Sequence, residues 1–372
     1  MPKYLISGTN ASGRQVTEVV PAPTADEAVR RFTAHGFTDV VLHSDEVIGH
    51  LFKQEVLGDH LTPKDYLALG RVSRTRFVGL LVLRMYRQQW WLFLIGVALV
   101  VGRRVLEVPW ELIDWVAVVF LLSPVIIVLG GELFSPSRRF ERAMMYNAWA
   151  RWGEMLNALP GVRAMVPAPQ YAFYEAKALA GLGWLDEALE AVEPFANDRK
   201  IPAWLYWGQL ADVFITAKLP DRVIECGQKA LEHAPDNVTV LIDLAMSLLR
   251  YRRDTAAARA LLDRARQHAI SDVIAPFLAL AEGVLALEEK RPERARPLLE
   301  RSLDLALPLR HTTALMGAAI DRIHTYLCLA CAAGGDLPAA EAHFRTAEPR
   351  LRAFAANDLF ERCQAALGER AA

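Results

Sequence analysis

The chain has few cysteines, almost no net charge and none of the common catalytic signatures. Its four cysteines (Cys226, Cys328, Cys331 and Cys363) lack the spacing of an extracellular disulfide framework, and a single Cys-x-x-Cys is too little for a zinc site. The 42 Lys and Arg balance the 43 Asp and Glu, which argues against a nucleic-acid partner. No GxxxxGK(S/T), GxGxxG, HExxH or GxSxG motif occurs. The sequence therefore predicts a protein that is not an enzyme, with no catalytic residue, cofactor or metal site.

The most distinctive feature that is present is a long apolar stretch at residues 90–131. A helix needs roughly 20 mostly apolar residues to cross a bilayer, with about 17 at the short end. The run at 112–129 meets this length, whereas 90–106 spans fully, rather than re-entering, only if Arg103 and Arg104 snorkel to the headgroups. We expect a transmembrane helical hairpin. The alternative is a buried pair of core helices.

The basic residues around this stretch orient the expected hairpin. Six Lys and Arg lie within residues 59–89, four follow the second run by residue 151, and two lie between the runs. Basic residues concentrate on the cytoplasmic side, so both termini are expected there. The first apolar patch of the chain is too short for a secretory signal, so the hairpin would direct the chain to the membrane. Residues 59–89 form a basic helix that either lies among the headgroups or simply leads into the span.

Residues 1–58 predict a small α+β module. Residues 4–8 and 15–20 alternate as two strands around turn residues, and residues 37–42 form a third. Between them, Thr24 caps a helix with Glu27 three residues later, and Gly36 ends it.

This module resembles the small leading module of bacterial type II secretion and type IV pilus F-type inner-membrane proteins. The resemblance covers about forty residues and does not continue into the rest of the chain. It implies a docking module on the cytoplasmic side of a bacterial inner membrane, without a catalytic residue. The matching residues are Tyr4, Gly13, Ala25, Glu27, Ala28, Phe32 and Gly36.

Four histidines in this part of the chain raise the question of a metal site. His35, His43, His50 and His60 follow no common ligand spacing and have no cysteine near them, so we expect exposed histidines. The run His43-Ser44-Asp45 is not a catalytic triad either, because triad members meet in space and not in sequence.

Residues 170–368 carry a repeat of about 34 residues. A small residue recurs in the second helix of each expected helix pair, at Ala188, Val223, Ala258, Ala295 and Ala340, with steps of 35, 35, 37 and 45 residues. The pattern resembles the tetratricopeptide repeat family over roughly 200 residues, which implies an α-solenoid with a concave groove. Residues 140–160 are expected to form a capping helix that links the repeats to the membrane. The whole chain is therefore expected to be mostly α-helical.

The repeat register places seven side chains in the expected groove. Their mixed, rather apolar character suits a helix or an extended peptide of a protein partner. The alternative is that they pack against the next helix or against the chain's own tail. The lysine–asparagine clamp by which some members of the family bind acidic chain ends is missing. The seven residues are Phe173, Lys177, Asp212, Met246, Arg250, Phe277 and Val284.

These observations together predict a membrane-anchored scaffold. The hairpin would hold the module and the repeats at the cytoplasmic face of a bacterial inner (plasma) membrane, where the repeats recruit a protein to an envelope or secretion assembly. The alternative is an accessory subunit of a membrane enzyme or transporter that associates through the hairpin. The sequence leaves the oligomeric state open.

Overall fold

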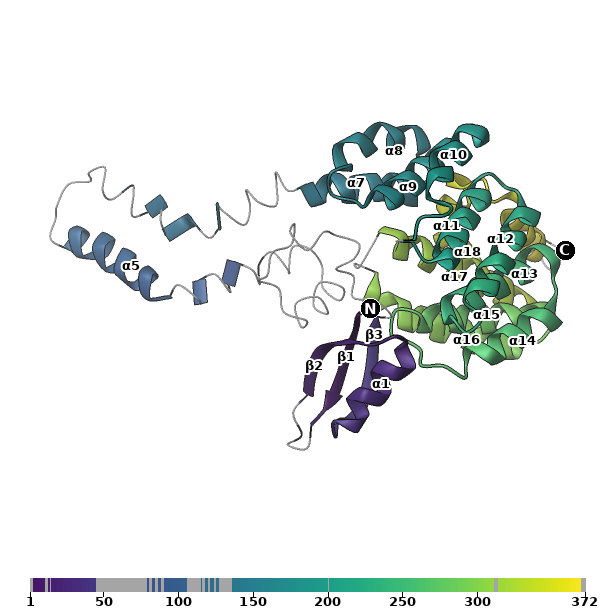
Figure 1. Cartoon of the computed structure of the whole chain (residues 1–372), viewed down its shortest axis with the longest axis horizontal. Coiled ribbons are helices and arrows are strands. Elements are labelled where there is room, and N and C mark those ends of the chain that lie inside the picture. Colours follow the sequence, from purple (N-terminus) through teal and green to yellow (C-terminus); the bar gives the residue numbers. More distant parts are fainter. Residues whose placement is uncertain are drawn as a thin grey trace.

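The computed structural model describes most of the 372-residue chain. The described residues are 3–44 apart from 11, 12 and 14, then 90–105, 136–199, 201–310 and 314–368, with isolated positions between 79 and 126. These residues form many helices and one three-stranded sheet (Figure 1), as the sequence predicts.

The N-terminal module pairs this sheet with one helix. Strand β1 (Lys3–Thr9) lies between β2 (Gln15–Pro21) and β3 (Thr38–Ser44), antiparallel to both. Helix α1 (Ala25–Ala34) packs on the sheet. The Thr24 hydroxyl accepts the amide of Glu27 at 3.2 Å, and Gly36 adopts φ +84°, so both predicted helix boundaries are confirmed. The module core consists of Tyr4, Ile6, Ala22, Ala28, Phe32 and Leu42.

Helix α5 (Trp90–Val105) covers the first predicted membrane run and has 16 residues. Among the described residues, no helix combines the length and the apolarity needed to cross a membrane. Most of the second predicted run, 112–129, lies outside the described residues. Most of the predicted basic helix at residues 59–89 lies outside them as well.

Residues 136–368, called the array below, are a succession of helices. The array begins with α7 (Pro136–Ala148) and α8 (Trp152–Ala158) in place of the single helix predicted over 140–160. Helix pairs follow: α9 (Ala168–Gly181) with α10 (Leu185–Val192), α11 (Ala203–Thr216) with α12 (Pro220–His233), α13 (Val238–Arg252) with α14 (Thr255–Ala265), α15 (Ala275–Glu288) with α16 (Pro292–Ala306), and α17 (Ala314–Ala333) with α18 (Leu337–Ala353), before α19 (Asn357–Gly368). Short 3-10 turns lie at Leu159–Val162, Glu193–Phe195 and Leu307–Leu309.

The predicted small residues mark the contacts within these helix pairs. All five are at most 2% exposed, and each lies on the second helix of a pair. A left-handed residue precedes each of them by five positions and reverses the chain between the two helices. Two of these residues are glycines, which adopt a positive φ readily. The other three carry side chains, so a positive φ strains their backbone. The left-handed residues are Gly183, Lys218, Arg253, Lys290 and Gly335.

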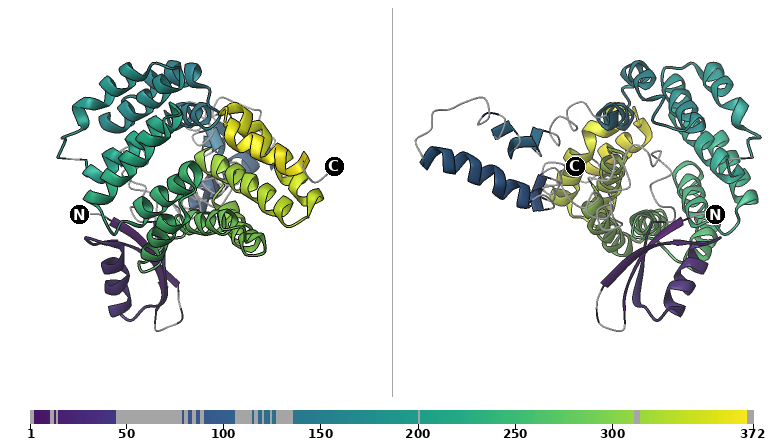
Figure 2. Two further views of the ribbon diagram at one scale, coloured as in Figure 1. Left: turned by 90° about the vertical axis from the view of Figure 1, so that its right-hand side faces the viewer. Right: turned by 60° about the vertical axis from the view of Figure 1, so that its left-hand side comes forward.

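The array curves until its first helices touch its last ones. In Figure 2 the first helices of the array lie beside its last ones, and α7 packs against α17. The Trp152 and Phe354 rings pack edge to face, with centroids 5.9 Å apart. Arg350 of α18 donates to the Ala148 carbonyl oxygen, lies 3.8 Å from the Trp149 ring centre and donates to Asp321 at 2.8 Å. The first two helices of the array therefore contact both the helix that follows them, α9, and the last helices of the array.

Candidate functional site

Two of the seven predicted groove residues lie in the apolar core. Phe173 is 4% exposed and packs edge-on against Tyr206, with ring centres 5.5 Å apart, and Val284 is fully buried between helices. Neither side chain can reach a partner, so the predicted groove lining is corrected at these two positions. The repeat period in the sequence shows which face of each helix turns towards the other helices. It does not show which residues of that face are buried in the core and which stay accessible at its surface.

The other five predicted residues retain some exposure. Met246 and Phe277 are half-buried against the array core. Lys177 of α9 and Asp212 of α11 form an ion pair at 3.8 Å, which joins neighbouring helix pairs. Arg250 of α13 makes two hydrogen bonds with the Asp358 carboxylate of α19, at 3.2 and 3.1 Å. Arg250 therefore contacts the last helix of the described chain, which is the alternative to a place in the groove that the sequence analysis left open.

Asp243 of α13, which the sequence analysis did not single out, is a carboxylate with a strongly shifted pKa. Its side chain reaches solvent, yet burial among the surrounding helices raises its pKa to about 7, and Asp212 adds to the increase while Arg322 opposes it. Burial also raises the pKa of Tyr174 to about 12; a hydrogen bond from Gln170 works against this shift. Asp212 of α11 and Asp243 of α13 are therefore close enough to influence each other electrostatically.

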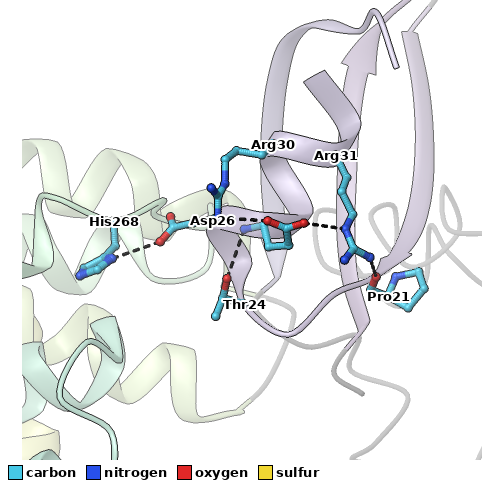
Figure 3. A network of polar contacts seen from close by, with 7 residues as sticks. Pro21, Thr24, Asp26, Arg30, Arg31 and His268 are labelled. Atoms are coloured by element: carbon cyan, nitrogen blue, oxygen red, sulfur yellow. Dashed lines mark hydrogen bonds and ion pairs between the residues drawn. The ribbon is translucent and has the colours of Figure 1, made fainter. Parts of the chain in front are cut away.

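A second polar site joins the N-terminal module to the array, between α1 and the connection from α14 to α15. The Asp26 carboxylate lies 3.1 Å from His268 Nδ1 (Figure 3) and accepts the Ala269 amide at 2.7 Å. The Asp272 amide donates to the Leu42 carbonyl oxygen at 2.8 Å. Burial acts to raise the pKa of Asp26, but the Ala269 amide and His268 outweigh it and lower this pKa below 3.8.

His43 lies at the same interface, which corrects the prediction that it is exposed. It is 7% exposed, and its Nε2 lies 2.6 Å from Ser7 Oγ while its Nδ1 lies 2.8 Å from Asp272 Oδ2. Sequence reasoning missed Asp272 because it lies 229 residues from His43, and no local pattern marks it.

The order Ser7–His43–Asp272 is that of a Ser-His-Asp triad. Ser7, however, is 1% exposed and lies on the central strand of the sheet, so a substrate has no access to its hydroxyl. Separating the module from the array to admit a substrate would also take Asp272 away from His43. The contacts therefore hold the module in place and do not form a working nucleophile.

The remaining histidine and cysteine clusters are small. His324 and His343 approach with their Nδ1 atoms 2.9 Å apart, and burial lowers the pKa of both. Among the described residues, no group of three or more potential ligands could hold a metal ion. All four cysteines are free and buried.

Neither the models of known protein families nor the curated protein sequences contain a match to this chain.

Proposed function

We propose that the chain is a membrane-anchored scaffold without enzymatic activity. The hairpin would hold the module and the array at the cytoplasmic face of a bacterial inner membrane, with both termini on that side. The array would act as a tetratricopeptide-like solenoid that binds a helix or an extended peptide of a protein partner.

The observation that carries the anchoring is an exposed apolar stripe on each of the two predicted membrane runs. In the first run, Trp90, Leu94, Val97 and Val101 follow helical spacing and are 45–61% exposed. In the second, Trp115, Val119, Leu122 and Ile126 repeat this spacing at 48–60%. Soluble proteins rarely leave such stripes in water, whereas lipid covers them at no cost.

A hydrogen bond supports the pairing of the two runs. The Tyr86 hydroxyl donates to the Leu121 carbonyl oxygen at 3.0 Å, so the segment just before α5 lies beside the middle of the second run. The contact supports the approach of the two segments that a hairpin would bring together. The orientation of the hairpin rests on the distribution of six, four and two basic residues described above.

The solenoid part of the proposal rests on the repeated turn. Left-handed residues and small buried residues recur with the same steps of 35, 35, 37 and 45 residues, so each helix pair repeats one local geometry. The partner would contact the accessible part of the inner face, where Lys177, Asp212, Met246 and Phe277 lie.

Site-specific photocrosslinking of the full chain in membranes tests this function. A photoreactive residue at Asp212 should capture a partner, while one at Leu307, an exposed residue on a connection, should not. Alkaline extraction of the same membranes should leave the chain in the pellet. A chain released by alkali would contradict the anchor, and no capture from Asp212 would contradict the groove.

The second candidate function is an accessory subunit of a membrane enzyme or transporter. The exposed stripes favour it as well, because they could pack against membrane helices of another protein. Photoreactive residues at Val97 and Val119 separate the two functions. Capture from these positions without capture from Asp212 would replace the scaffold by the accessory subunit.

The absence of enzymatic activity is proposed on the burial of Ser7. A fluorophosphonate probe, which reacts with activated serines, should not label Ser7 in the full chain. Labelling that Ser7→Ala abolishes would overturn this part of the proposal.

A further inference from the structure

The C-terminal end of α7 presents apolar and aromatic side chains to solvent. Met145 is 49% exposed and Trp149 is 37% exposed. Together with Tyr146 and Arg151 they line a mostly apolar hollow of about 410 Å³ that opens to solvent, and these four residues are called the α7 patch below. A different face of α7 holds the helix on the array, through Phe140, Ala143 and Met144. The packing of the array therefore does not explain why the patch is apolar.

The turn after α7 fixes the two aromatic rings of the patch. Ala150 adopts a left-handed φ of 51°, and the Arg151 amide donates to the Tyr146 carbonyl oxygen at 2.9 Å. This turn brings the Arg151 guanidinium to 5.1 Å from the centre of the Tyr146 ring. The guanidinium of Arg350 lies 3.8 Å from the centre of the Trp149 ring and supports it from within the array. Because both rings are already held in place, little conformational entropy is lost when the patch binds.

The residue types of the patch suit the interface between a bilayer and water. Tryptophan and tyrosine are enriched there, because an apolar ring and a polar group meet in one side chain. Arginine places its stem on apolar surface and keeps its charge at the headgroups. Arg142 is exposed and lies one helical turn before Met145 and Tyr146, on the same face. Residues 136–155 contain four arginines and two glutamates, and this excess of positive charge favours an anionic lipid surface.

The position of α7 in the chain keeps the patch near the proposed membrane anchor. Helix α7 begins at Pro136, seven residues after the end of the second predicted run at residue 129. Seven residues reach at most about 25 Å. The 13 residues of α7 make a helix about 20 Å long, so it can lie along the bilayer surface. The short connection raises the effective concentration of the patch at the lipid, so a weak contact is enough.

We propose that the α7 patch, with Arg142, contacts the headgroup region of the anionic bilayer in which the chain is anchored and so fixes the array on the membrane surface. This inference rests on the anchoring proposed above and adds a second contact with the same lipid. Because Trp149 stacks on Arg350 of α18, the closed end of the array, where its first and last helices meet, would face the bilayer.

Fluorescence quenching on the full chain in vesicles tests this contact. The vesicles contain equal amounts of phosphatidylcholine and phosphatidylglycerol, with a nitroxide on some of the headgroups. A fluorophore is attached at Met145→Cys, and the four native cysteines are buried. We expect the nitroxide to remove about half of the emission at this position. A fluorophore at Leu307→Cys, an exposed position on a connection, should keep nearly all of its emission.

A fluorophore at Val97→Cys in the first predicted run separates this contact from the anchor. With the nitroxide on the acyl chains, Val97 should be quenched if the anchor is correct. Quenching at Val97 together with a Met145 position that behaves like Leu307 would overturn the contact and leave the anchor in place. Quenching at Met145 without quenching at Val97 would support the contact and contradict the anchor. No quenching at either position would overturn both.

A matched pair of variants tests the role of charge in the contact. Arg142→Gln removes one basic side chain beside the patch and should weaken the contact about fivefold, which the Met145 fluorophore reports as a loss of quenching. Arg294→Gln, at an exposed arginine of α16, makes the same change of charge elsewhere and should leave quenching unchanged. Vesicles of phosphatidylcholine alone should weaken the contact more than Arg142→Gln does. Equal quenching in the two variants, or equal quenching in both kinds of vesicle, would overturn the proposed contact with anionic lipid.

Discussion

The array and the interface between the N-terminal module and the array are held together by different forces. Within the array, helix pairs share a continuous apolar core in which residues such as Leu241, Leu262 and Leu299 are completely buried. Between module and array, the contacts are mainly hydrogen bonds and the two histidine–carboxylate pairs. One chain thus combines a framework held by apolar burial with an attachment held by hydrogen bonds and side-chain pairs.

The largest effect is expected where the array core is densest. The Leu299 side chain of α16 is fully buried against Gly283 of α15, where an added Cβ would lie 2.6 Å from it. Leu299→Ala leaves a cavity and should lower the free energy of unfolding by about 2–5 kcal/mol. Denaturant unfolding measures the loss, which should be equal at pH 5.5 and 8.5.

The matched control for this substitution is Leu307→Ala. Leu307 is 40% exposed, so its truncation should change the free energy of unfolding by less than about 0.5 kcal/mol. A loss at Leu299 that varied with pH would break the contrast between array and interface.

A smaller effect is expected at the closure between the two ends of the array. The Arg350 side chain is 12% exposed. It donates a hydrogen bond to the Ala148 carbonyl oxygen, lies over the Trp149 ring and forms an ion pair with Asp321. Arg350→Met leaves Asp321 without its guanidinium and should cost about 2 kcal/mol, a value between those for exposed and buried pairs. Hydrogen exchange should increase in α7 and α17 before it increases in α15.

Arg352→Met serves as the control on the same helix. Its guanidinium is 63% exposed and pairs with Glu348 on the surface at 2.8 Å, so the change should be below about 0.5 kcal/mol. Equal losses for Arg350→Met and Arg352→Met would show that the closure contributes no specific stability.

The sequence predicted these regions unequally for a physical reason. Helix pairing leaves a periodic trace, because each pair must bury a small residue at the same place; Ala188 and Ala258 therefore reveal the array. The strand–helix boundaries of the module are local, and Thr24 and Gly36 mark them. Neither signal exists for contacts between distant segments.

Three residues were predicted to be accessible and are buried, because contacts between distant segments leave no local signal. His43 was expected to be exposed because its partner Asp272 is 229 residues away. Phe173 and Val284 were expected in a groove because periodicity gives a face but not the depth at which a residue lies. The exposed apolar stripes were different, because their helical spacing is visible in the sequence itself.

At the docking interface, removal of one charge should have a moderate effect. Asp26→Asn keeps an acceptor for the Ala269 amide but removes the charge that faces His268, so the docking equilibrium should fall about fivefold at pH 5.5. In the native chain the docked form lowers the pKa of Asp26 below 3.8, so its contribution is present above about pH 4 and lost below that pH. Distances between spin labels at Glu18→Cys on β2 and Glu293→Cys on α16, both exposed positions, measure both effects.

Asp39→Asn is the control for Asp26→Asn. Asp39 is an exposed carboxylate of the same module, and its left-handed φ of 49° suits asparagine as well as aspartate. Docking should be unchanged in this variant. A fall equal to that of Asp26→Asn would mean that the net charge of the module, and not the Asp26–His268 pair, determines docking.

The smallest effect is expected at Asp243, a carboxylate of the array whose charge depends on pH and whose exposed side chain is screened by solvent. The folded array raises the pKa of Asp243 from 3.8 to about 7, mainly through burial, so the folded state holds a proton that the unfolded chain releases. Stability should therefore decrease as the pH rises from about 4 to 7. Asp243→Asn removes this loss, and its free energy of unfolding should exceed that of the native chain at pH 8 but not at pH 4.5. Asp304→Asn, at an exposed carboxylate of α16, should follow the native curve. Parallel curves for all three proteins would contradict the raised pKa of Asp243; the expected divergence would place a group that responds to pH inside the array, near Asp212 on the face proposed to bind a partner.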